Sequence, residues 1–426
     1  MSINLAAREG GLQTPIQTHG PPSARRQTWL DALRGVAVLA VLFEHLLDPL
    51  FPEVRATVSP WFDLGQYGVM VFFLISGYVV PASLERRGSV AGFWIGRVFR
   101  LYPLFLLAAV LATVFGLVQV YSSLPAQLGE SPVVSGLAHL TMLQDFVQVV
   151  SVINVFWTLS YEMVFYLLVT AIFVLGRGRG GGTAGTLTFA MAAVLVGGTL
   201  PAGALSRGLG GDVVVLIVAM VLMAGLAAVL GGGHRVRMCG AIILATLAVV
   251  LLAVNSRVGA WQSLAIVATM FAGTALSRLD EGRLRRGITS WLIVLVPVVC
   301  IAAAIWFGPG WGMSEEKALA FRWSWSAAVA AAWLTFLLAR ALRSYTWPGV
   351  LVRLGLISYS FYLLHPLGIQ VLRRLIPQPA PVPLGGRIAA SVLLLGVVVA
   401  CAALTYRFVE RPAQDLGRRL ARSVGR

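Results

Sequence analysis

The sequence predicts an all-α polytopic membrane protein with about 10–12 transmembrane helices. Of its 426 residues, 58% are hydrophobic and only 12% are charged, whereas soluble proteins average about 25% charged residues. The mean hydropathy is +0.83, and apolar runs of about 20 residues recur along the chain. Because this composition places the chain in a lipid bilayer, the formal net charge of +16 does not indicate a nucleic-acid partner.

Twelve apolar runs define the expected membrane spans. Each is long enough for a helix that crosses the hydrocarbon core of about 30 Å. Several runs are separated by only a few residues, so a count of ten or eleven helices also fits the pattern. The runs cover residues 29–50, 66–84, 98–120, 153–176, 185–205, 211–231, 238–255, 258–277, 287–307, 323–342, 352–372 and 387–409.

The distribution of basic residues predicts how these spans are oriented. If the N-terminus is cytoplasmic, 24 arginines fall in or beside cytoplasmic segments and eight basic residues fall on the other side, with Arg34 inside the first span. Cytoplasmic segments of membrane proteins carry the excess of arginine and lysine. Both termini are therefore expected in the cytoplasm, and the protein in the cytoplasmic (inner) membrane. The basic loop at 373–387 runs against this assignment.

The two ends of the chain are expected to lie outside the membrane domain. Residues 1–28 are polar and proline-containing, and are predicted to form a disordered cytoplasmic tail. Residues 29–412 contain all twelve runs and form the membrane domain, while residues 413–426 are predicted to be a basic cytoplasmic tail. The long non-cytoplasmic loop 121–152 contains LAHLTMLQDF, which is expected to lie on the bilayer or dip into it.

Four polar side chains from four spans are expected at a similar depth. At a helical rise of about 1.5 Å per residue, His45 lies about 16 Å beyond Arg34, and Glu162 lies about 14 Å into its span. Ser76 and His365 lie about 15 Å and about 18 Å from the starts of theirs. Ionisable groups inside a membrane are costly and mark functional sites. The alternatives are a hydrogen bond from each histidine to a neighbouring helix and a small-residue helix contact at Ser76.

An arginine pair opens the third span from the cytoplasmic side. Arg97 and Arg100 are three residues apart and therefore lie on one helical face. Guanidinium groups bind phosphate oxygens in a bidentate manner, and a helix N-terminus favours anions. The alternative is that both arginines only anchor the helix among lipid headgroups. Tyr102 and Pro103 follow, and the proline is able to kink the helix.

The residue spacing indicates no bound cofactor and no metal site. The three cysteines, at 239, 300 and 401, lie in or beside apolar runs and are interpreted as small packing residues. The histidines are scattered and lack the short spacing of metal ligands. They are His19, His45, His139, His234 and His365.

Six segments occur in one order along residues 29–412. LDALRGVAVLAVLFEHL places Arg34 and His45 on either side of ten intervening residues, RVFRLYP holds the arginine pair, and FWTLSYEMVFY holds Trp157 and Glu162. The other three are GVMVFFLISGYVV, ISYSFYLLHPL and RFVERP. Together these segments resemble the motifs of the acyltransferase-3 family of integral membrane O-acyltransferases.

The resemblance implies an enzyme that moves an acyl group, commonly acetyl, from cytoplasmic acyl-CoA to a hydroxyl of a sugar, glycan or glycolipid acceptor. It assigns residues 29–412 to the acyltransferase domain. The family core usually has ten helices, fewer than the twelve runs counted above. Residues 180–345 match none of the quoted motifs and are expected to determine the acceptor.

The same resemblance gives each candidate side chain an expected role. His45 would act as general base on the acceptor hydroxyl, and Glu162 would orient it or act as base itself. Ser76 and Tyr102 are the candidate oxyanion donors. The acyl-CoA side is expected to contain Arg34, Arg97, Arg100 and Tyr102. The remaining candidates for contact with substrate are Asp31, Ser76, Trp157, Tyr362 and His365.

Two other classes of protein share parts of this pattern. A secondary transporter, or a flippase for an acylated lipid or sugar, also has about twelve spans and charged residues at the midplane. A receptor or assembly subunit with a dead site is the third class. The sequence shows no inverted repeat, and the arginine pair opposite a histidine fits a CoA-ester site better than a transport site. Release of free CoA discriminates an acyltransferase from a transporter.

Overall fold

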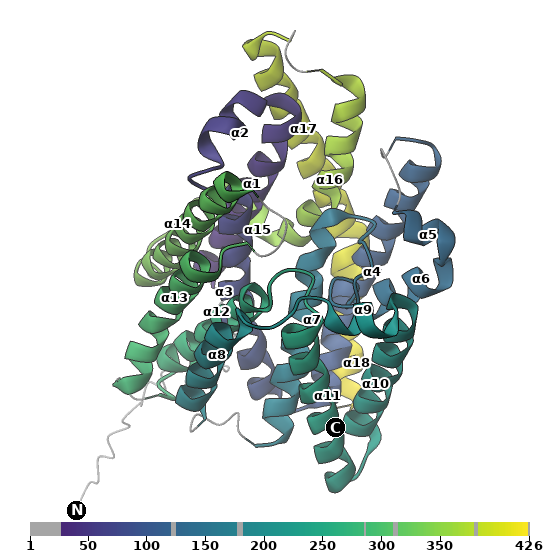
Figure 1. Ribbon diagram of the computed structural model, residues 1–426, viewed down its shortest axis with the longest axis vertical. Coiled ribbons are helices and arrows are strands. Elements are labelled where there is room, and N and C mark those ends of the chain that lie inside the picture. Colours follow the sequence, from purple (N-terminus) through teal and green to yellow (C-terminus); the bar gives the residue numbers. More distant parts are fainter. Residues whose placement is uncertain are drawn as a thin grey trace, which may run out of the picture.

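The structure, a computed structural model, describes residues 27–120, 125–176, 182–284, 287–309, 314–378 and 382–424. Within these ranges the chain forms helices joined by loops (Figure 1). Nine of the helices in these ranges are long and apolar enough to cross a membrane, or ten if a bent pair counts as one span. The predicted all-α polytopic membrane fold is therefore confirmed.

The helices follow all twelve predicted apolar runs. A 3₁₀ turn at Asn154–Phe156 precedes α7, and a π-helical turn at Tyr406–Glu410 joins the last two helices. The helices are α1 Thr28–Leu50, α2 Pro52–Val58, α3 Leu64–Arg87, α4 Val90–Leu117, α5 Ala126–Glu130, α6 Pro132–Thr141, α7 Trp157–Val174, α8 Thr183–Gly197, α9 Ala204–Leu209, α10 Gly211–Gly231, α11 His234–Val254, α12 Ala260–Asp280, α13 Ile288–Phe307, α14 Glu315–Ala341, α15 Gly349–Leu356, α16 Ser358–Leu375, α17 Leu384–Thr405 and α18 Arg411–Val424.

Two of the twelve runs are helical but are not typical membrane spans. Helix α8 has only 15 residues. Helix α1 is long enough, but every window of 18 residues in it contains at least three charged side chains. Most residues of α1 are nonetheless buried among other helices. Asp31, Arg34 and Glu44 therefore face the protein interior, where a membrane protein tolerates charge, whereas Asp48 near the end of α1 is exposed and pairs with Arg55.

The centre of the bundle depends on contact between helix backbones. Helix α3 packs along α12, where Gly77 and Gly273 face each other. A Cβ atom on Gly77 would lie 1.9 Å from the carbonyl oxygen of Met270. The Thr274 hydroxyl also donates to the Gly77 carbonyl at 3.0 Å. Small residues allow this approach, which drives helix association where lipid removes the hydrophobic advantage.

Helix α15 meets α1 in the same way. A Cβ atom on Gly355 would lie 1.8 Å from the carbonyl oxygen of Asp31, and one on Gly35 would lie 2.3 Å from that of Leu351. Helices α15 and α16 are bent by 77° relative to each other. This broken pair brings the start of α16 beside α1.

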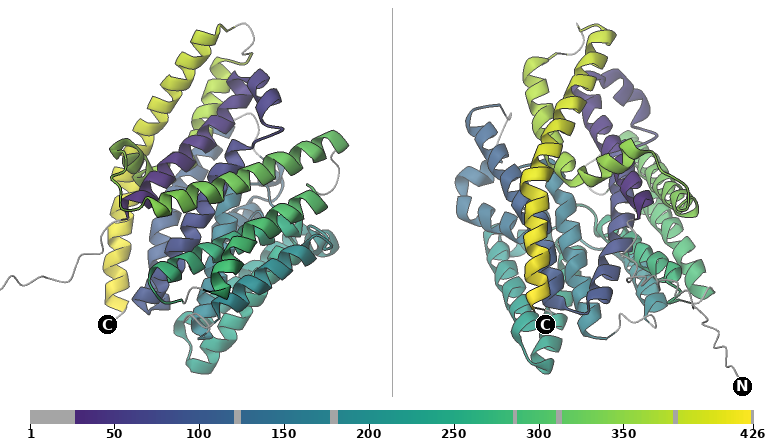
Figure 2. Two further views of the ribbon diagram at one scale, coloured as in Figure 1. Left: turned by 90° about the vertical axis from the view of Figure 1, so that its left-hand side faces the viewer. Right: turned by 180° about the vertical axis from the view of Figure 1, so that it is seen from behind.

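The C-terminal helices differ from the sequence prediction. The last predicted span, with a tail after residue 412, is one nearly continuous rod of α17, the π-helical turn and α18 (Figure 2). Helix α18 packs on α4, with Gly417 against the side chain of Phe99. The search for apolar runs missed this second helix because α18 is strongly basic and its apolar face is narrow. The predicted tail at residues 1–26 lies outside the described residues.

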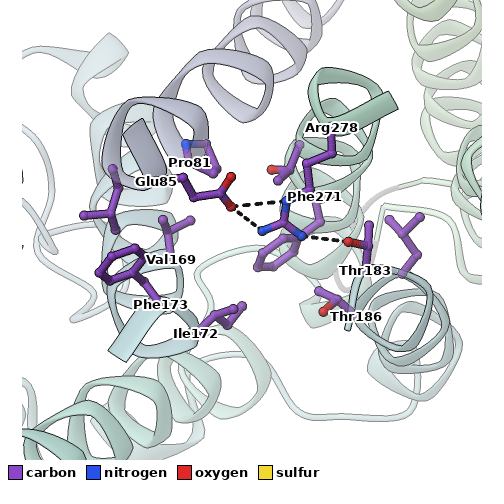
Figure 3. A pocket seen from close by; sticks show the side chains of 12 residues that line it. Pro81, Glu85, Val169, Ile172, Phe173, Thr183, Thr186, Phe271 and Arg278 are labelled. Carbon is purple, nitrogen blue, oxygen red and sulfur yellow. Dashed lines mark hydrogen bonds and ion pairs between the residues drawn. The ribbon is translucent and has the colours of Figure 1, made fainter. Parts of the chain in front are cut away.

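One end of the bundle carries a cluster of arginines, and we call it the arginine-rich end. It consists of the ends of α3, α12 and α14 and the start of α4. Figure 3 shows a buried Arg278 there, which donates to Glu85 at 3.2 Å and to Thr183 at 2.7 Å beside a pocket of about 440 Å³. Nearby, Asp280 accepts hydrogen bonds from Arg340 and Tyr78. These contacts join α3, α8, α12 and α14.

The α3–α12 contact predicts opposite effects for two matched substitutions. Gly77→Ala should lower the stability by about 1–3 kcal/mol, because overpacking forces the two backbones apart. Gly396→Ala in α17, where a Cβ meets nothing within 4 Å, should leave the melting temperature unchanged or slightly raised. Thermal unfolding of both variants in detergent micelles checks this, and equal effects would contradict the close contact.

Candidate active site

A cavity of about 690 Å³ opens among α1, α3, α4, α7 and α16. We call it the arginine cavity. It gathers five of the predicted site residues from these five helices. These are Arg34, Ser76, Arg100, Glu162 and Tyr362. The remaining lining side chains are mostly apolar or aromatic, so the polar groups are few and converge on one space, as in small-molecule sites.

Charged groups of both signs surround the arginine cavity. Arg34 donates to Asp31 at 3.0 Å, one turn earlier on α1, and interacts electrostatically with Arg100 and Glu162. On the far side, the buried Glu410 accepts a hydrogen bond from Ser360 at 2.8 Å. Asp31, which we predicted to contact substrate, is not a lining residue of this cavity and instead pairs with Arg34.

The two arginines of the RVFRLYP segment are not equivalent. Arg100 lines the cavity. Arg97 instead lies over the rings of Phe93 and Tyr166, with centroid distances of 5.2 and 5.5 Å. Tyr166 donates to the carboxylate of Glu162. Arg97 thus reaches the cavity only indirectly, through the tyrosine that holds Glu162.

A pair of histidines lies where α1 meets α16. The rings of His45 and His365 contact each other edge to face with centroids 5.0 Å apart, and His365 is fully buried. Nδ1 of His45 lies 2.8 Å from the carbonyl oxygen of Val41. A carbonyl only accepts hydrogen bonds, so Nδ1 carries the proton and Nε2 keeps its lone pair. That Nε2 faces the amide of Asn154 at 3.4 Å.

The neighbours of His45 differ from the predicted ones. We expected Glu162 to orient this ring, but the hydrogen bonds of His45 run to Val41, Asn154 and His365. Glu162 is held by Tyr166 instead. The physical reason is local: a carbonyl one turn back on α1 is the nearest acceptor for Nδ1.

Tyr102 and Trp157 complete the placement of the predicted residues. The Tyr102 hydroxyl donates to the carbonyl of Leu140 at 2.7 Å and so ties α4 to α6, away from the arginine cavity. Trp157 starts α7 and packs edge to face on Tyr161 and Phe73. Its indole lines a second cavity.

This second cavity, which we call the loop cavity, has a volume of about 960 Å³. It lies toward the end of the bundle opposite the arginine-rich end, beside the first turn of α3. The loop between α6 and α7 forms one wall and is itself buried, anchored by Asn255, which donates to the Phe146 carbonyl at 2.7 Å. The polar lining residues are Gln66, Asp145, Ser151, Asn154, Arg257 and Gln262.

The histidine pair lies between the two cavities. Asn154, which contacts His45, lines the loop cavity. Tyr362, whose ring centroid is 5.8 Å from that of His365, lines the arginine cavity. Phe73 lines the arginine cavity and packs on Trp157 of the loop cavity. A thin aromatic wall with two histidines at its edge therefore separates two polar spaces.

Several polar residues of this region were missed by the sequence reasoning. Asp145 and Ser151 belong to a loop and Asn154 begins the 3₁₀ turn before α7, and no α-helical period predicts where such residues point. Arg257 and Gln262 flank the start of α12, outside every recognised motif. The one available signal was Asp145 itself, the one carboxylate in the segment HLTMLQDFVQVV.

Asp145 is almost completely buried, with 4% of its surface exposed. Burial raises the pKa of its carboxyl group to about 6, although the guanidinium of Arg257 at 3.6 Å partly opposes the shift. Desolvation disfavours the charged carboxylate, while a nearby cation favours it. Asp145 therefore titrates near neutral pH, in a loop outside the membrane-spanning helices.

The fold and the buried polar groups define a multi-pass membrane protein with a polar site inside its helical bundle. Comparison with known families identifies it further. The family model described as "Acyltransferase domain" matches residues 27–206 and 213–407, and the chain belongs to this acyltransferase-3 family. The predicted family membership is thereby confirmed.

Two characterised relatives match parts of the chain. "Acyltransferase MdmB" of Streptomyces mycarofaciens is 33% identical over 155 residues, which are 34% of this chain and 39% of that protein. "Nodulation protein 10" of Rhizobium leguminosarum bv. viciae is 37% identical over 75 residues, which are 17% of this chain and 20% of that protein. The matches thus span about two fifths of one relative and one fifth of the other. No solved structure matches the chain.

Titration of Asp145 predicts how stability depends on pH. Its pKa in the folded protein is raised from 3.8 to about 6. The stability it contributes is therefore fully present below about pH 3.8 and is lost as pH rises through about 6. Lowering the pH from 7 to 5 should raise the melting temperature of wild type relative to Asp145→Asn. An unchanged difference between the two proteins at pH 7 and pH 5 would contradict the raised pKa.

Proposed function

We propose that this protein moves an acyl group, most simply acetyl, from acyl-CoA to a hydroxyl of a sugar or glycan-type acceptor. One observation carries the proposal: Nδ1 of His45 is held by the Val41 carbonyl, while its Nε2 faces the amide of Asn154, a lining residue of the loop cavity. A neutral imidazole with a fixed tautomer is suited to remove a proton from a hydroxyl group. The family membership supports the transfer of an acyl group.

The arginine cavity is the proposed site of the acyl-CoA donor. Arg34 and Arg100 supply two guanidinium groups, which suit the phosphate oxygens or the thioester end of CoA. The donor enters from the arginine-rich end, which faces the cytoplasm if the positive-inside rule holds. The protein then lies in the cytoplasmic membrane with both termini inside. Arg97 supports this site through Tyr166 rather than by contact with the donor.

The chemistry follows from the positions of the histidines. The acceptor oxygen attacks the thioester carbonyl carbon as its proton passes to Nε2 of His45. The C–S bond then breaks, and the leaving CoA sulfur takes up the proton that Nε2 of His45 received, which restores the base. The carbonyl of Val41 holds the opposite ring nitrogen, so the ring keeps its orientation as it becomes positively charged. His365 packs on the same ring and positions it.

Ser76 and Glu162 have supporting roles in this proposal. The Ser76 hydroxyl lines the arginine cavity and is the candidate donor to the developing oxyanion. Glu162, held by Tyr166, balances the charge of the two arginines next to the thioester. Tyr102 is removed from the oxyanion role in this proposal because its hydroxyl is used by α6.

A secondary transporter or flippase is the second candidate function. The observation that favours it is the presence of two cavities on either side of a central wall, which is also how alternating-access proteins are built. The two functions differ in one product, because only acyl transfer releases free CoA.

Removal of the proposed base tests the function directly. Purified protein in nanodiscs, given acetyl-CoA and a panel of methyl glycosides, should release CoA in an acceptor-dependent manner. His45→Ala should lower kcat by about 10²–10⁴-fold, the usual contribution of a general base. His234→Ala, at an exposed position on α11, is the matched control and should behave as wild type. Normal turnover by His45→Ala would remove His45 from the mechanism.

Substitutions of the two arginines of the third span should change different kinetic parameters. Arg100→Ala should raise the KM for acetyl-CoA about tenfold with a smaller change in kcat, as expected for a lost ground-state contact. Arg97→Ala should mainly lower kcat, because it loosens Tyr166 and Glu162 rather than a donor contact. Initial rates at varied acetyl-CoA check both. Identical effects on KM would mean that both arginines bind the donor.

A further inference from the structure

We propose that the loop cavity is the acceptor site and that it selects an uncharged sugar ring through Ser151, Gln262 and Trp157. The inference deepens the proposed function and rests on it. It assigns the acceptor to Ser151 and Gln262, which lie outside the quoted motifs, together with Trp157 of the FWTLSYEMVFY segment.

Two buried polar atoms of the loop cavity have no hydrogen-bond partner among the described residues. They are Oε1 of Gln262 and Oγ of Ser151, on residues that are each 9% exposed. An unpaired buried polar group costs about 1–3 kcal/mol. Both side chains line the cavity, one from α12 and the other from the loop before α7. Unmet hydrogen-bonding groups that converge on one space indicate a ligand with hydroxyl groups.

The charges of the loop cavity indicate an uncharged ligand. Its one carboxylate, Asp145, and its one guanidinium, Arg257, face each other at 3.6 Å. Because they neutralise each other, a net charge on the ligand would leave one member of this pair without compensation. Trp157, half-buried in the same wall, adds an aromatic surface for the C–H faces of a ring.

The cavity also leads to the proposed base. Asn154 lines it and lies 3.4 Å from Nε2 of His45. A hydroxyl that displaces the Asn154 amide from this nitrogen, or sits beside it, is in position for deprotonation. The space inside the cavity that a water-sized sphere can occupy is about 400 Å³, which falls within the usual range of ligand pockets, about 300–1,000 Å³. The arginine cavity and the loop cavity thus supply donor and acceptor from opposite ends of the bundle.

The binding test needs no turnover. In a background with the exposed Cys239 and Cys401 replaced by serine, Ser151→Cys is labelled with a small charged thiol reagent with and without methyl glucoside. The sugar should slow labelling several-fold. Thr57→Cys, at an exposed position on α2 outside the cavity, is the control and should label at the same rate with and without sugar.

The charge preference is tested with the same variant. Methyl glucuronide, which is anionic, and methyl glucosaminide, which is cationic, should protect Ser151→Cys less than the uncharged glucoside. Protection by none of the three glycosides overturns the sugar site. Equal or better protection by a charged glycoside overturns the selection of an uncharged ring.

Kinetics separate this inference from the proposed function. Gln262→Leu should raise the KM for methyl glucoside about tenfold and leave the KM for acetyl-CoA unchanged. Thr269→Val, which removes a buried hydroxyl two turns further along α12, is the matched control and should change neither. An unchanged acceptor KM in Gln262→Leu overturns the role of Gln262. Sugar protection without any CoA release would instead keep the sugar site and reject acyl transfer.

Discussion

The contact between the backbones of α3 and α12 is the constraint on which both cavities depend. Gly77 and Gly273 bring the two helices close enough that a single added carbon has no room. Helix α3 then presents Ser76 to the arginine cavity and Gln66 to the loop cavity, while α12 presents Gln262 from its first turns. A wider separation would move the walls of both spaces at once, so two small residues determine the geometry of a site that contains neither of them.

The second recurring feature is that backbone carbonyls, not charged partners, orient His45 and Tyr359. His45 is held by the carbonyl of Val41 one turn away, and Tyr359 donates to that of Leu101 at 2.8 Å. In a bundle surrounded by lipid, a charged partner carries a large desolvation cost, whereas a carbonyl that is already buried adds little. The histidine therefore keeps one tautomer without a neighbouring carboxylate.

The sequence predicted the helices well because twenty consecutive apolar residues have few alternatives in a membrane. Depth along a helix was predictable only in part. It grouped Ser76 and Glu162, which do share the arginine cavity, with the two histidines, which do not line it. Arg34, expected about 16 Å from His45, lines the cavity as well. The direction in which each side chain points around the helix axis was not predictable. Arg97 and Arg100 share a helical face, yet only Arg100 reaches the cavity. The partner of His45 is Asn154, at the start of the 3₁₀ turn before α7, and its position depends on the folding of the whole loop before that turn and follows from no periodic pattern.

The rod formed by α17, the π-helical turn and α18 spans 41 residues, or about 60 Å at the helical rise, twice the thickness of the hydrocarbon core. Such a rod cannot sink into a bilayer, because its second half carries Arg411, Arg418 and Arg422. Helix α18 packs on α4, the helix of Arg100, and Glu410 in the turn is bonded to α16. The rod therefore determines how far below the headgroups the guanidinium of Arg100 lies. That distance is sensitive to bilayer thickness.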